Sequence, residues 1–184
     1  MTFYKDGFLV IRNFVPKKQR DILLKHISKL SSPIMNDPQA DNTPSFYGDS
    51  VFTKIQLQLL PKLEKHTKLE LLKTYTYGRV YKKGDILRIH KDRPACEISI
   101  TIDLGGDKWP IWILDRDENP VKISLNPGDI LVYRGCDIHH WRGKFDGNKH
   151  TQVFMHYVDK FGPYAWAEND KRKSNNENNN SRNG

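Results

Sequence analysis

Cysteine and long apolar runs are both scarce in this sequence. The chain has only two cysteines, Cys96 and Cys136, which are far apart and form no Cys-x-x-Cys pair. This argues against a disulfide scaffold and favours a reduced, cytosolic setting. No apolar stretch is long enough to span a bilayer, and the first residues carry an acid and a base before any apolar run. We therefore expect a soluble, cytoplasmic protein with no targeting segment and no membrane association.

Internal repeats are also absent, and the 184 residues fit a single domain. A chain of this length buries about two thirds of the surface that its unfolded form exposes, so it needs no staple to fold. We expect one domain over residues 1–168, with a helical layer at 1–68 and a β core at 69–160. Residues 169–184 contain no apolar side chain and are rich in Asn and Lys, which is typical of a disordered tail.

The formal net charge of +8 raises the question of nucleic-acid binding, because a basic surface attracts phosphates. The distribution of the charge weakens this hypothesis. The last fourteen residues hold +3 of it, and the remaining +5 is spread over 170 residues. We interpret the tail as a solubilising end, with an electrostatic arm as the alternative.

The first third of the chain reads as a strand, two helical regions and a long loop. Residues 8–14 predict a strand, and residues 17–30 place their apolar side chains along one helical face. Residues 31–50 are rich in Ser, Pro, Asn, Asp and Gly, which predicts a long loop and a candidate lid over a site. Residues 53–67 look helical, but Pro61 argues for two shorter pieces or for a helix that begins there.

From residue 69 onward the pattern becomes β. Short branched or aromatic runs, separated by turn residues, predict strands at 73–81, 86–90, 97–104, 111–114, 121–125, 130–133 and 151–158. This spacing predicts a sandwich or jelly roll packed against the N-terminal helical layer. Within 97–104, isoleucine and leucine alternate with Glu97, Ser99, Thr101 and Asp103. The polar set either lines an inner face beside a metal cleft or faces water.

One constellation carries chemistry. His90 and Asp92 are separated by one residue at the end of the run 86–92, and His140 follows about fifty residues later, after a Pro-Gly-Asp turn. If residues 86–92 are extended, His90 and Asp92 point to the same side and can bind one ion together. Two imidazoles and one carboxylate are the facial arrangement of non-haem Fe(II) oxygenases, which leaves coordination positions open for chemistry.

These features resemble the 2-oxoglutarate and Fe(II)-dependent dioxygenases, in the branch similar to prolyl 4-hydroxylase. The likeness extends over most of the chain and includes the opening segment 6–16, the spacing Tyr81-x8-His90-x-Asp92 and the segment 126–135, Asn-Pro-Gly-Asp-Ile-Leu-Val-Tyr-Arg-Gly. The resemblance implies a double-stranded β-helix, a cupin-like jelly roll, that is mainly β with N-terminal helices. It also implies Fe(II) held by His90, Asp92 and His140, with 2-oxoglutarate and O2 as cosubstrates and ascorbate as a further candidate.

The resemblance also suggests residues that bind the cosubstrate. His139 is the rival of His140 for the distal ligand position. In this family an anchor for the far carboxylate of 2-oxoglutarate lies about ten residues beyond the distal histidine, which leads to His150, where the family pattern has Lys or Arg. A histidine can fill that role if it is protonated. Arg142 and Lys149 are the alternatives, and Tyr81 is expected to reach the cosubstrate through its hydroxyl.

Other candidates have a structural reading beside the functional one. Tyr75 and Tyr77 share the face of Tyr81 in a regular strand and are either site residues or core aromatics. Arg88 either meets substrate or cosubstrate or lies at the surface. The remaining histidines, His26, His66 and His156, lack ligand spacing and are expected to be structural or exposed. The tryptophans Trp109, Trp112 and Trp166 are expected to be packing groups. Trp141 is the exception, because it adjoins the metal loop in sequence.

We expect an enzyme that hydroxylates an unactivated C–H bond of a small molecule, an amino acid or a peptidyl proline and decarboxylates 2-oxoglutarate to succinate. One alternative is oxidative demethylation of nucleic-acid bases. The related branch that does this usually has two arginines in the strand after the distal histidine, whereas this chain has no arginine between Arg142 and Arg172. Another alternative is a non-catalytic jelly-roll protein with a structural metal or none. The oligomeric state is left open by the sequence.

Overall fold

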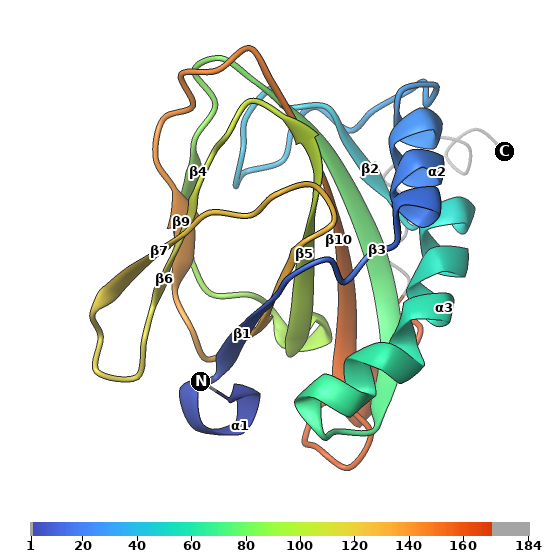
Figure 1. Cartoon of the computed structure of the whole chain (residues 1–184), viewed down its shortest axis with the longest axis vertical. Helices are drawn as coiled ribbons and strands as arrows, with labels where there is room; N and C mark the ends of the chain where they lie inside the picture. Colours follow the sequence, from blue (N-terminus) through green and yellow to red (C-terminus); the bar gives the residue numbers. More distant parts are fainter. Residues whose placement is uncertain (1, 171–184) are drawn as a thin grey trace, which may run out of the picture.

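Two antiparallel β-sheets dominate the computed structural model, which describes residues 2–170 (Figure 1). The larger sheet has the strand order β1-β8-β5-β10-β3-β2 and the smaller one the order β4-β9-β6-β7. The strands are β1 (Phe8–Ile11), β2 (Ser45–Tyr47), β3 (Leu71–Lys82), β4 (Leu87–His90), β5 (Ile98–Gly106), β6 (Ile111–Leu114), β7 (Pro120–Ile123), β8 (Ile130–Arg134), β9 (His140–Arg142) and β10 (Lys149–Asp159). The helices are α1 (Phe3–Asp6), α2 (Lys17–Ile27) and α3 (Ser50–Thr67), with short 3-10 helices at Pro94–Cys96 and Ala165–Ala167.

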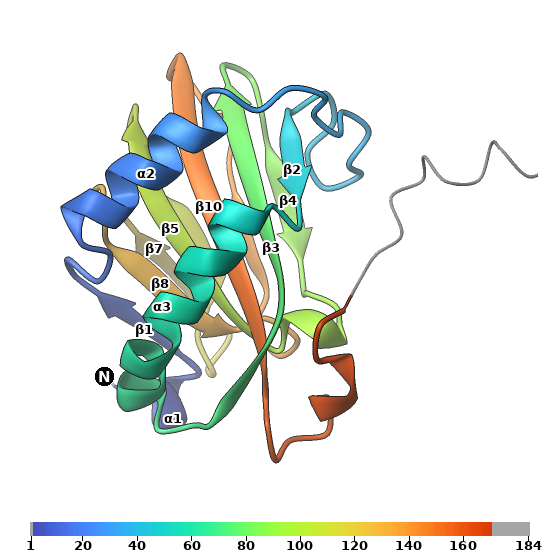
Figure 2. The same ribbon diagram turned by 90° about the vertical axis from the view of Figure 1, so that its right-hand side faces the viewer.

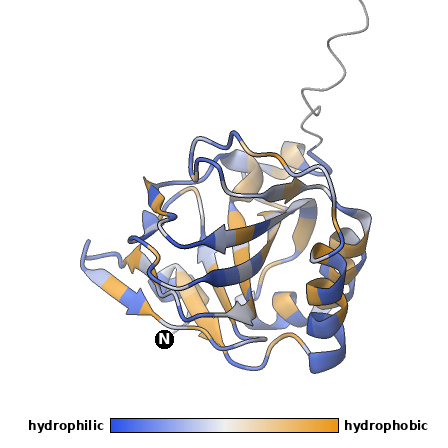
Figure 3. Ribbon diagram, turned by 90° about the horizontal axis from the view of Figure 1, so that it is seen from above, coloured by the Kyte–Doolittle hydropathy of each residue, from blue (hydrophilic) through white to orange (hydrophobic). Residues whose placement is uncertain are grey.

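Helices α2 and α3 cover one face of the larger sheet and cross in front of β3, β10 and β5 in Figure 2. Both helices carry hydrophobic and hydrophilic residues along their length (Figure 3), and their buried side chains, such as Leu23 and Phe52, join Ile100 and Ile102 of β5 in the main core. The predicted helical layer on a jelly-roll core is therefore confirmed. Over residues 2–170, no helix has the length and apolar character needed to cross a membrane.

Helix α3 runs without a break through Pro61, so the prediction of two pieces was wrong. Asp49 caps its first turn by accepting hydrogen bonds from the backbone N–H groups of Val51 and Phe52, and Lys68 ends the helix in the left-handed conformation. A proline ring frees the carbonyl four residues earlier, which here belongs to Leu57. Leu57 is exposed, so water can satisfy that carbonyl and the helix continues.

The alternation along β5 separates the two faces of the larger sheet. Ile98, Ile100, Ile102 and Leu104 face the helices and are at most 2% exposed. Their polar neighbours are buried too, although they lie on the opposite face: Ser99 and Thr101 are 0% exposed and Asp103 is 6% exposed. The prediction that these polar side chains line an inner face is therefore correct, and the alternative that they face water is wrong. The interior between the two sheets therefore has a polar wall.

Two short strands were not predicted. Strand β2 (Ser45–Tyr47) lies inside the expected loop 31–50, and β9 (His140–Arg142) falls where no strand was expected. Each has only three residues, which is too short for a periodic signal. Asn169 and Asp170, placed in the tail by composition, hydrogen-bond to the body of the fold through Lys73 and Tyr47. The rest of the predicted tail lies outside the described residues.

Candidate metal centre and cavity

His90 and His140 lie side by side in the smaller sheet. His90 is the last residue of β4 and pairs in register with His140, the first residue of β9. Their ring centroids are 4.2 Å apart. In a regular strand, Leu87 and His90 would point to opposite faces. A register shift between them breaks this alternation, so Leu87 and His90 line the same cavity. The irregular strand end is what turns His90 inward.

Asp92 joins the two histidines from the loop that follows β4, because β4 ends at His90, as the predicted strand 86–90 does. Its backbone N–H donates to the carbonyl of Gly135 at 2.8 Å. A Cβ at position 135 would collide with the Asp92 carboxylate, so only glycine permits this approach. One oxygen of Asp92, Oδ1, lies 3.6 Å from Nε2 of His90 and 3.6 Å from Nε2 of His140. The structure thus brings the three predicted ligands together.

Backbone carbonyls set the tautomer of both histidines. Nδ1 of His90 lies 2.7 Å from the carbonyl of Arg88, and Nδ1 of His140 lies 3.1 Å from the carbonyl of Ile138. A carbonyl can only accept, so Nδ1 carries the proton in each ring and Nε2 keeps a lone pair. Both lone pairs are directed toward the Asp92 carboxylate, the orientation that metal-binding histidines have when a partner holds their other nitrogen.

Burial tunes the charges of the three groups. It lowers the pKa of His140 to about 4, and burial together with the nearby His140 lowers the pKa of His90. Both imidazoles are therefore neutral near pH 7. Burial raises the pKa of Asp92 to about 6, against the opposing effect of His90. Apart from these neutral histidines, Asp92 has no ion-pair partner among residues 2–170, so a divalent cation would supply the missing charge.

The spacing of the three donor atoms fits one transition-metal ion. Ligand atoms held about 2.1 Å from an ion at roughly right angles lie about 3 Å from each other, so separations of 3.6 Å close with small side-chain movements. A second donor group, Asp92 with Cys96 and His156, shares the same carboxylate. Burial keeps the pKa of the Cys96 thiol well above its ordinary value, and a neutral thiol is a poor ligand. The His90, Asp92 and His140 group is the better metal site.

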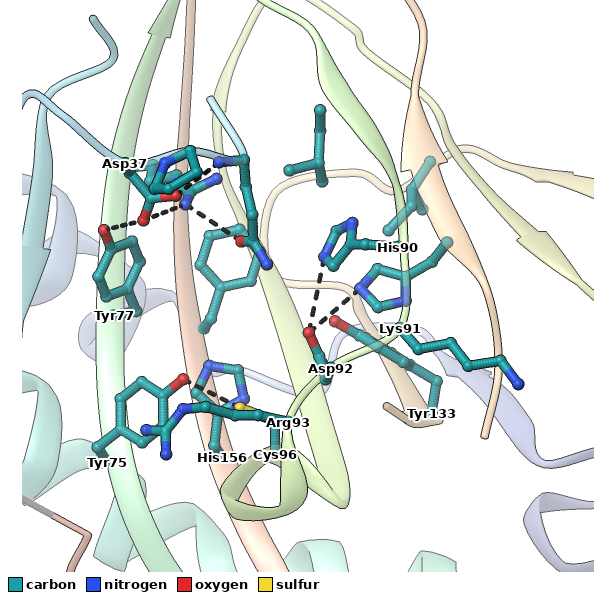
Figure 4. Close-up of a pocket in the computed structure, with 17 residues that line it drawn as sticks. Asp37, Tyr75, Tyr77, His90, Lys91, Asp92, Arg93, Cys96, Tyr133 and His156 are labelled. Atoms are coloured by element: carbon teal, nitrogen blue, oxygen red, sulfur yellow. Dashed lines mark hydrogen bonds and ion pairs between the residues drawn. The ribbon is translucent and has the colours of Figure 1, made fainter. Parts of the chain in front are cut away.

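The three ligands line one side of a cavity of about 330 Å³. The opposite side is formed by residues of β3 and β10, and the segment between α2 and β2 closes the top (Figure 4). The lining residues from these parts are Asp37, Pro38 and Gln39 of the segment, Tyr75, Tyr77 and Arg79 of β3, and Phe154 and His156 of β10. The predicted loop therefore does cover the candidate site.

Arg79 is the buried cation of this cavity wall. Its side chain is 3% exposed and forms an ion pair of 2.7 Å with Asp37. The hydroxyl of Tyr77 donates to the same oxygen, Asp37 Oδ2, at 2.7 Å, and Gln39 accepts a weaker hydrogen bond from Arg79 at 3.4 Å. Burial alone would raise the pKa of Asp37, but the positive charge of Arg79 and the hydrogen bond from the Tyr77 hydroxyl hold it below its ordinary value.

Tyr81, Arg142 and His150 are buried together beside this cavity, at 0%, 2% and 1% exposure. Arg142 donates to the carbonyl of Trp109 and lies over the Trp109 ring. Burial lowers the pKa of Arg142 to about 10 and that of His150 to about 4. Polar atoms of the inner face here have no hydrogen-bond partner among the described residues: Tyr81 Oη, Thr101 Oγ1, Arg142 Nε, His150 Nε2 and both amide atoms of Gln152.

Several sequence expectations about the site change with the structure. Arg88 is exposed and pairs with Asp41 at the surface, because the irregularity in β4 removes it from the face of His90. Trp141 stacks on Trp112, away from the cavity-facing side of β9. His139 is exposed and lies outside the ligand group.

Lys149 is exposed, whereas His156, expected to be structural or exposed, is buried and lines the cavity. Sequence reasoning also missed Asp37 and Arg79, whereas Ser99 belongs to the polar set that was predicted either to line an inner face or to face water. Arg79 could have been found, since it continues the alternation of Tyr75, Tyr77 and Tyr81. Nothing in the pattern of the chain points to Asp37, because a loop residue has no periodicity that places it.

No protein-family model and no curated protein sequence matches the chain. Solved structures do match its fold. A prolyl-4-hydroxylase from Pseudomonas putida is 14% identical, with a TM-score of 0.69 over 85% of this chain and 95% of that one. HygX from Streptomyces hygroscopicus, with nickel and 2-oxoglutarate bound, is 15% identical, with a TM-score of 0.69 over 86% and 85%. SnoN, an α-ketoglutarate-dependent epimerase from nogalamycin biosynthesis, is 9% identical, with a TM-score of 0.72 over 85% and 78%.

Sequence identities this low show similarity of fold alone, and the fold that the resemblance implies is confirmed. The chain has the jelly-roll fold of the 2-oxoglutarate and Fe(II)-dependent oxygenases.

Proposed function

We propose that this protein is a Fe(II)- and 2-oxoglutarate-dependent oxygenase that hydroxylates an unactivated C–H bond of a small molecule, an amino acid or a peptidyl proline. The observation that carries the proposal is the convergence of His90 Nε2, His140 Nε2 and Asp92 Oδ1 at one side of a cavity in this fold. A trio of this kind occupies one side of an ion and leaves the other side open. That open side would face the cavity.

These three residues would hold the iron. Bound iron and 2-oxoglutarate supply the activation of O2, coupled to decarboxylation of 2-oxoglutarate to succinate and CO2. The protein's part is to hold the ligands in place, orient the substrate and exclude water. Ser99 contributes by lying 3.1 Å from Oδ2 of Asp92, the oxygen that does not face the histidines. Such contacts fix the orientation of a ligating carboxylate.

Arg142 is the residue that we propose as the anchor for the far carboxylate of 2-oxoglutarate. It lies two residues after His140 on the same face of β9, about 7 Å along the strand, which a five-carbon dicarboxylate can span. Its guanidinium is fully buried, has no ion pair within the described part of the chain, and keeps Nε without a partner. With a pKa of about 10 it is charged at neutral pH, and a buried unpaired charge calls for an anion.

His150, favoured by position in the sequence, is less suited to this role. Its Nδ1 faces the carbonyl of Asp107 at 3.0 Å, so Nδ1 carries the proton and Nε2 presents a lone pair. Burial and the nearby Arg142 lower the pKa of His150 to about 4, so it is neutral near pH 7. A lone pair repels a carboxylate. The hydroxyl of Tyr81, buried and unpaired, is the better second donor beside Arg142.

The experiment is an anaerobic titration with Fe(II) and 2-oxoglutarate, following the weak visible charge-transfer band of the chelate. Wild type should develop the band and Asp92→Ala should not. Arg142→Met should raise the 2-oxoglutarate concentration for half-saturation about 10- to 100-fold, as expected for one charged hydrogen-bonded pair. His150→Ala is the matched control and should change it much less. Iron binding without any band in wild type would contradict the proposed function.

A jelly-roll protein with a purely structural metal is the competing reading. Slow decarboxylation of 2-oxoglutarate without substrate, dependent on iron and on Asp92, separates the two, because a binding module cannot carry it out. Asp92→Ala would then abolish succinate formation. Absence of succinate in iron-loaded wild type would favour the binding module.

A further inference from the structure

A second buried arginine in the cavity, Arg79, has a carboxylate partner that does not belong to the β core. Asp37 comes from the segment between α2 and β2 and reaches down onto β3, where it meets Arg79 and Tyr77 (Figure 4). The wall that carries Arg79 lies opposite the side with His90 and Asp92. A group bound at Arg79 would therefore hold the rest of a small molecule toward the candidate metal centre.

The Arg79–Asp37 pair uses only part of what the guanidinium offers. Asp37 Oδ2 contacts Nη2 of Arg79 at 2.7 Å, while the Nε of Arg79 is buried and has no hydrogen-bond partner among residues 2–170. A carboxylate that is free to choose its position binds an arginine through two parallel hydrogen bonds. Asp37, restricted by its own backbone, leaves one of these donors unused. A free carboxylate could use both and also accept the Tyr77 hydroxyl.

The charges that line the cavity favour an anionic guest once Asp37 has moved away from Arg79. The cationic side chains that line it are Arg79, Lys91 and Arg93, and the acidic ones are Asp37 and the proposed ligand Asp92. Arg93 is already paired with Asp170. If Asp37 withdraws, Arg79 is left as a buried charge without a counter-ion, which costs free energy unless another anion replaces it.

We propose that Arg79 and Tyr77 bind the carboxylate of the primary substrate, a small carboxylic acid such as an amino acid, and that Asp37 holds this position until the substrate displaces it. This inference deepens the proposed function by naming the substrate class. The cavity of about 330 Å³ suits a small molecule or a chain end. The segment that carries Asp37 remains attached at its base through the hydrogen bond of Thr43 to Asp85 at 2.9 Å, so only its tip has to move.

The chain contains a matched control in the same segment. Asp41 pairs with Arg88 at 3.6 Å, but both side chains are exposed and neither lines the cavity. Neutralising Asp41 or Arg88 therefore removes an ion pair of the segment without touching the proposed subsite. Comparing Asp37→Asn with Asp41→Asn, and Arg79→Met with Arg88→Met, separates carboxylate binding from a general loosening of the segment.

The probe is 4-fluorobenzoate, with 4-fluorobenzamide as its uncharged counterpart, and binding is followed by fluorine NMR on the full chain with and without Fe(II) and saturating 2-oxoglutarate. Asp37→Asn should bind the benzoate about tenfold more tightly than wild type, because the internal competitor is gone. Asp41→Asn and Arg88→Met should match wild type. Adding Arg79→Met to Asp37→Asn should abolish the gain, and the benzamide should bind weakly to all variants.

Three results would overturn the inference: equal benzoate binding by Asp37→Asn and Asp41→Asn, retained binding in the Arg79→Met double variant, or equal binding of the benzamide. A loss of 2-oxoglutarate affinity in Arg79→Met as large as that in Arg142→Met would also overturn it, since Arg79 would then serve the cosubstrate. Thermal unfolding of each variant shows whether it is folded.

The two proposals fail in different ways. Benzoate binding at Arg79 does not require iron, because neither Arg79 nor Tyr77 is a proposed ligand. A wild type that shows no charge-transfer band but binds benzoate through Arg79 would contradict the oxygenase and keep the subsite. A wild type with a normal charge-transfer band, together with unchanged benzoate binding in Asp37→Asn, would keep the oxygenase and contradict the subsite.

Discussion

The two faces of the larger sheet are made by the same strands and are both buried, yet they differ in what they bury. The face under α2 and α3 is mainly apolar, and its side chains pack into one core that includes Ile100 and Val153. The inner face, toward the smaller sheet, carries Ser99, Thr101 and Arg79, with several polar atoms lacking any partner in the described chain. Buried polar atoms are nearly always hydrogen-bonded in folded proteins.

This contrast teaches that the two faces serve different purposes. The helix-covered face supplies the stability of the fold through burial of apolar area. The inner face gives up part of that stability in exchange for groups that can bind ligands, a pattern common at functional sites. Substitutions on the two faces should therefore have opposite signatures, and neighbouring residues on one strand provide the cleanest pairs.

The largest effect is expected on the apolar face. Ile100→Ala should lower the free energy of unfolding by about 3–4 kcal/mol, because Ile100 is 0% exposed and leaves a cavity in the main core. Its neighbour Thr101 has a buried hydroxyl without a partner, so Thr101→Val should leave that free energy unchanged or raise it. Urea denaturation measures both. A loss in Thr101→Val as large as that in Ile100→Ala would show that the two faces are energetically alike.

The next effect is expected at Arg142, where ligand binding and stability should separate. Arg142→Met should weaken 2-oxoglutarate binding by about 2 kcal/mol, while the unfolding temperature without ligands stays level or rises, since an unpaired buried charge is removed. Calorimetric titration and a thermal melt test the two parts. A lower unfolding temperature with intact cosubstrate affinity would assign Arg142 to the structure and not to the site.

A pH-dependent effect of similar size is expected at Asp103. Burial raises the pKa of Asp103 from 3.8 to about 6 in the folded state, so the folded state binds the proton more tightly than the unfolded state. The free energy of unfolding should fall by about 3 kcal/mol as pH rises from below about 4 to above about 6, and then stay level. Asp103→Asn should remove this part of the profile. Overlapping wild-type and variant profiles would contradict the shift.

The smallest effect is expected at Ser99, which supports Asp92 from the inner face. Ser99→Ala should weaken Fe(II) binding about tenfold, because the contact of 3.1 Å that orients the carboxylate is lost. Thr76 is the control, since it is a buried hydroxyl on the helix-covered side of β3. Thr76→Val should leave Fe(II) affinity unchanged in a competition assay with a chelator. Equal affinities in Ser99→Ala and wild type would remove Ser99 from the metal centre.

Much of the fold was accessible from the sequence because it depends on local patterns. The strand at 111–114 has the predicted bounds, the helix after Pro16 begins where predicted, and the alternation of β5 shows which residues share a face. The three residues that we propose as metal ligands were also predicted as a group, and the structure places them close together. Pro61 misled the prediction, because a proline is tolerated inside a helix where the carbonyl that loses its hydrogen bond is exposed to water. Which face of the helix is exposed depends on packing, and the sequence does not show it.

The sequence by itself therefore determined the periodicity of the main elements and the order in which the strands follow one another, because both arise from neighbours along the chain. It also supplied the candidate ligands. The tertiary structure decided which distant groups meet. Strand pairing set His140 beside His90, strand β9 turned Arg142 inward with it, and the segment before β2 carried Asp37 onto Arg79. These contacts join residues that are tens of positions apart, and only the closing of the two sheets around a shared interior determines them.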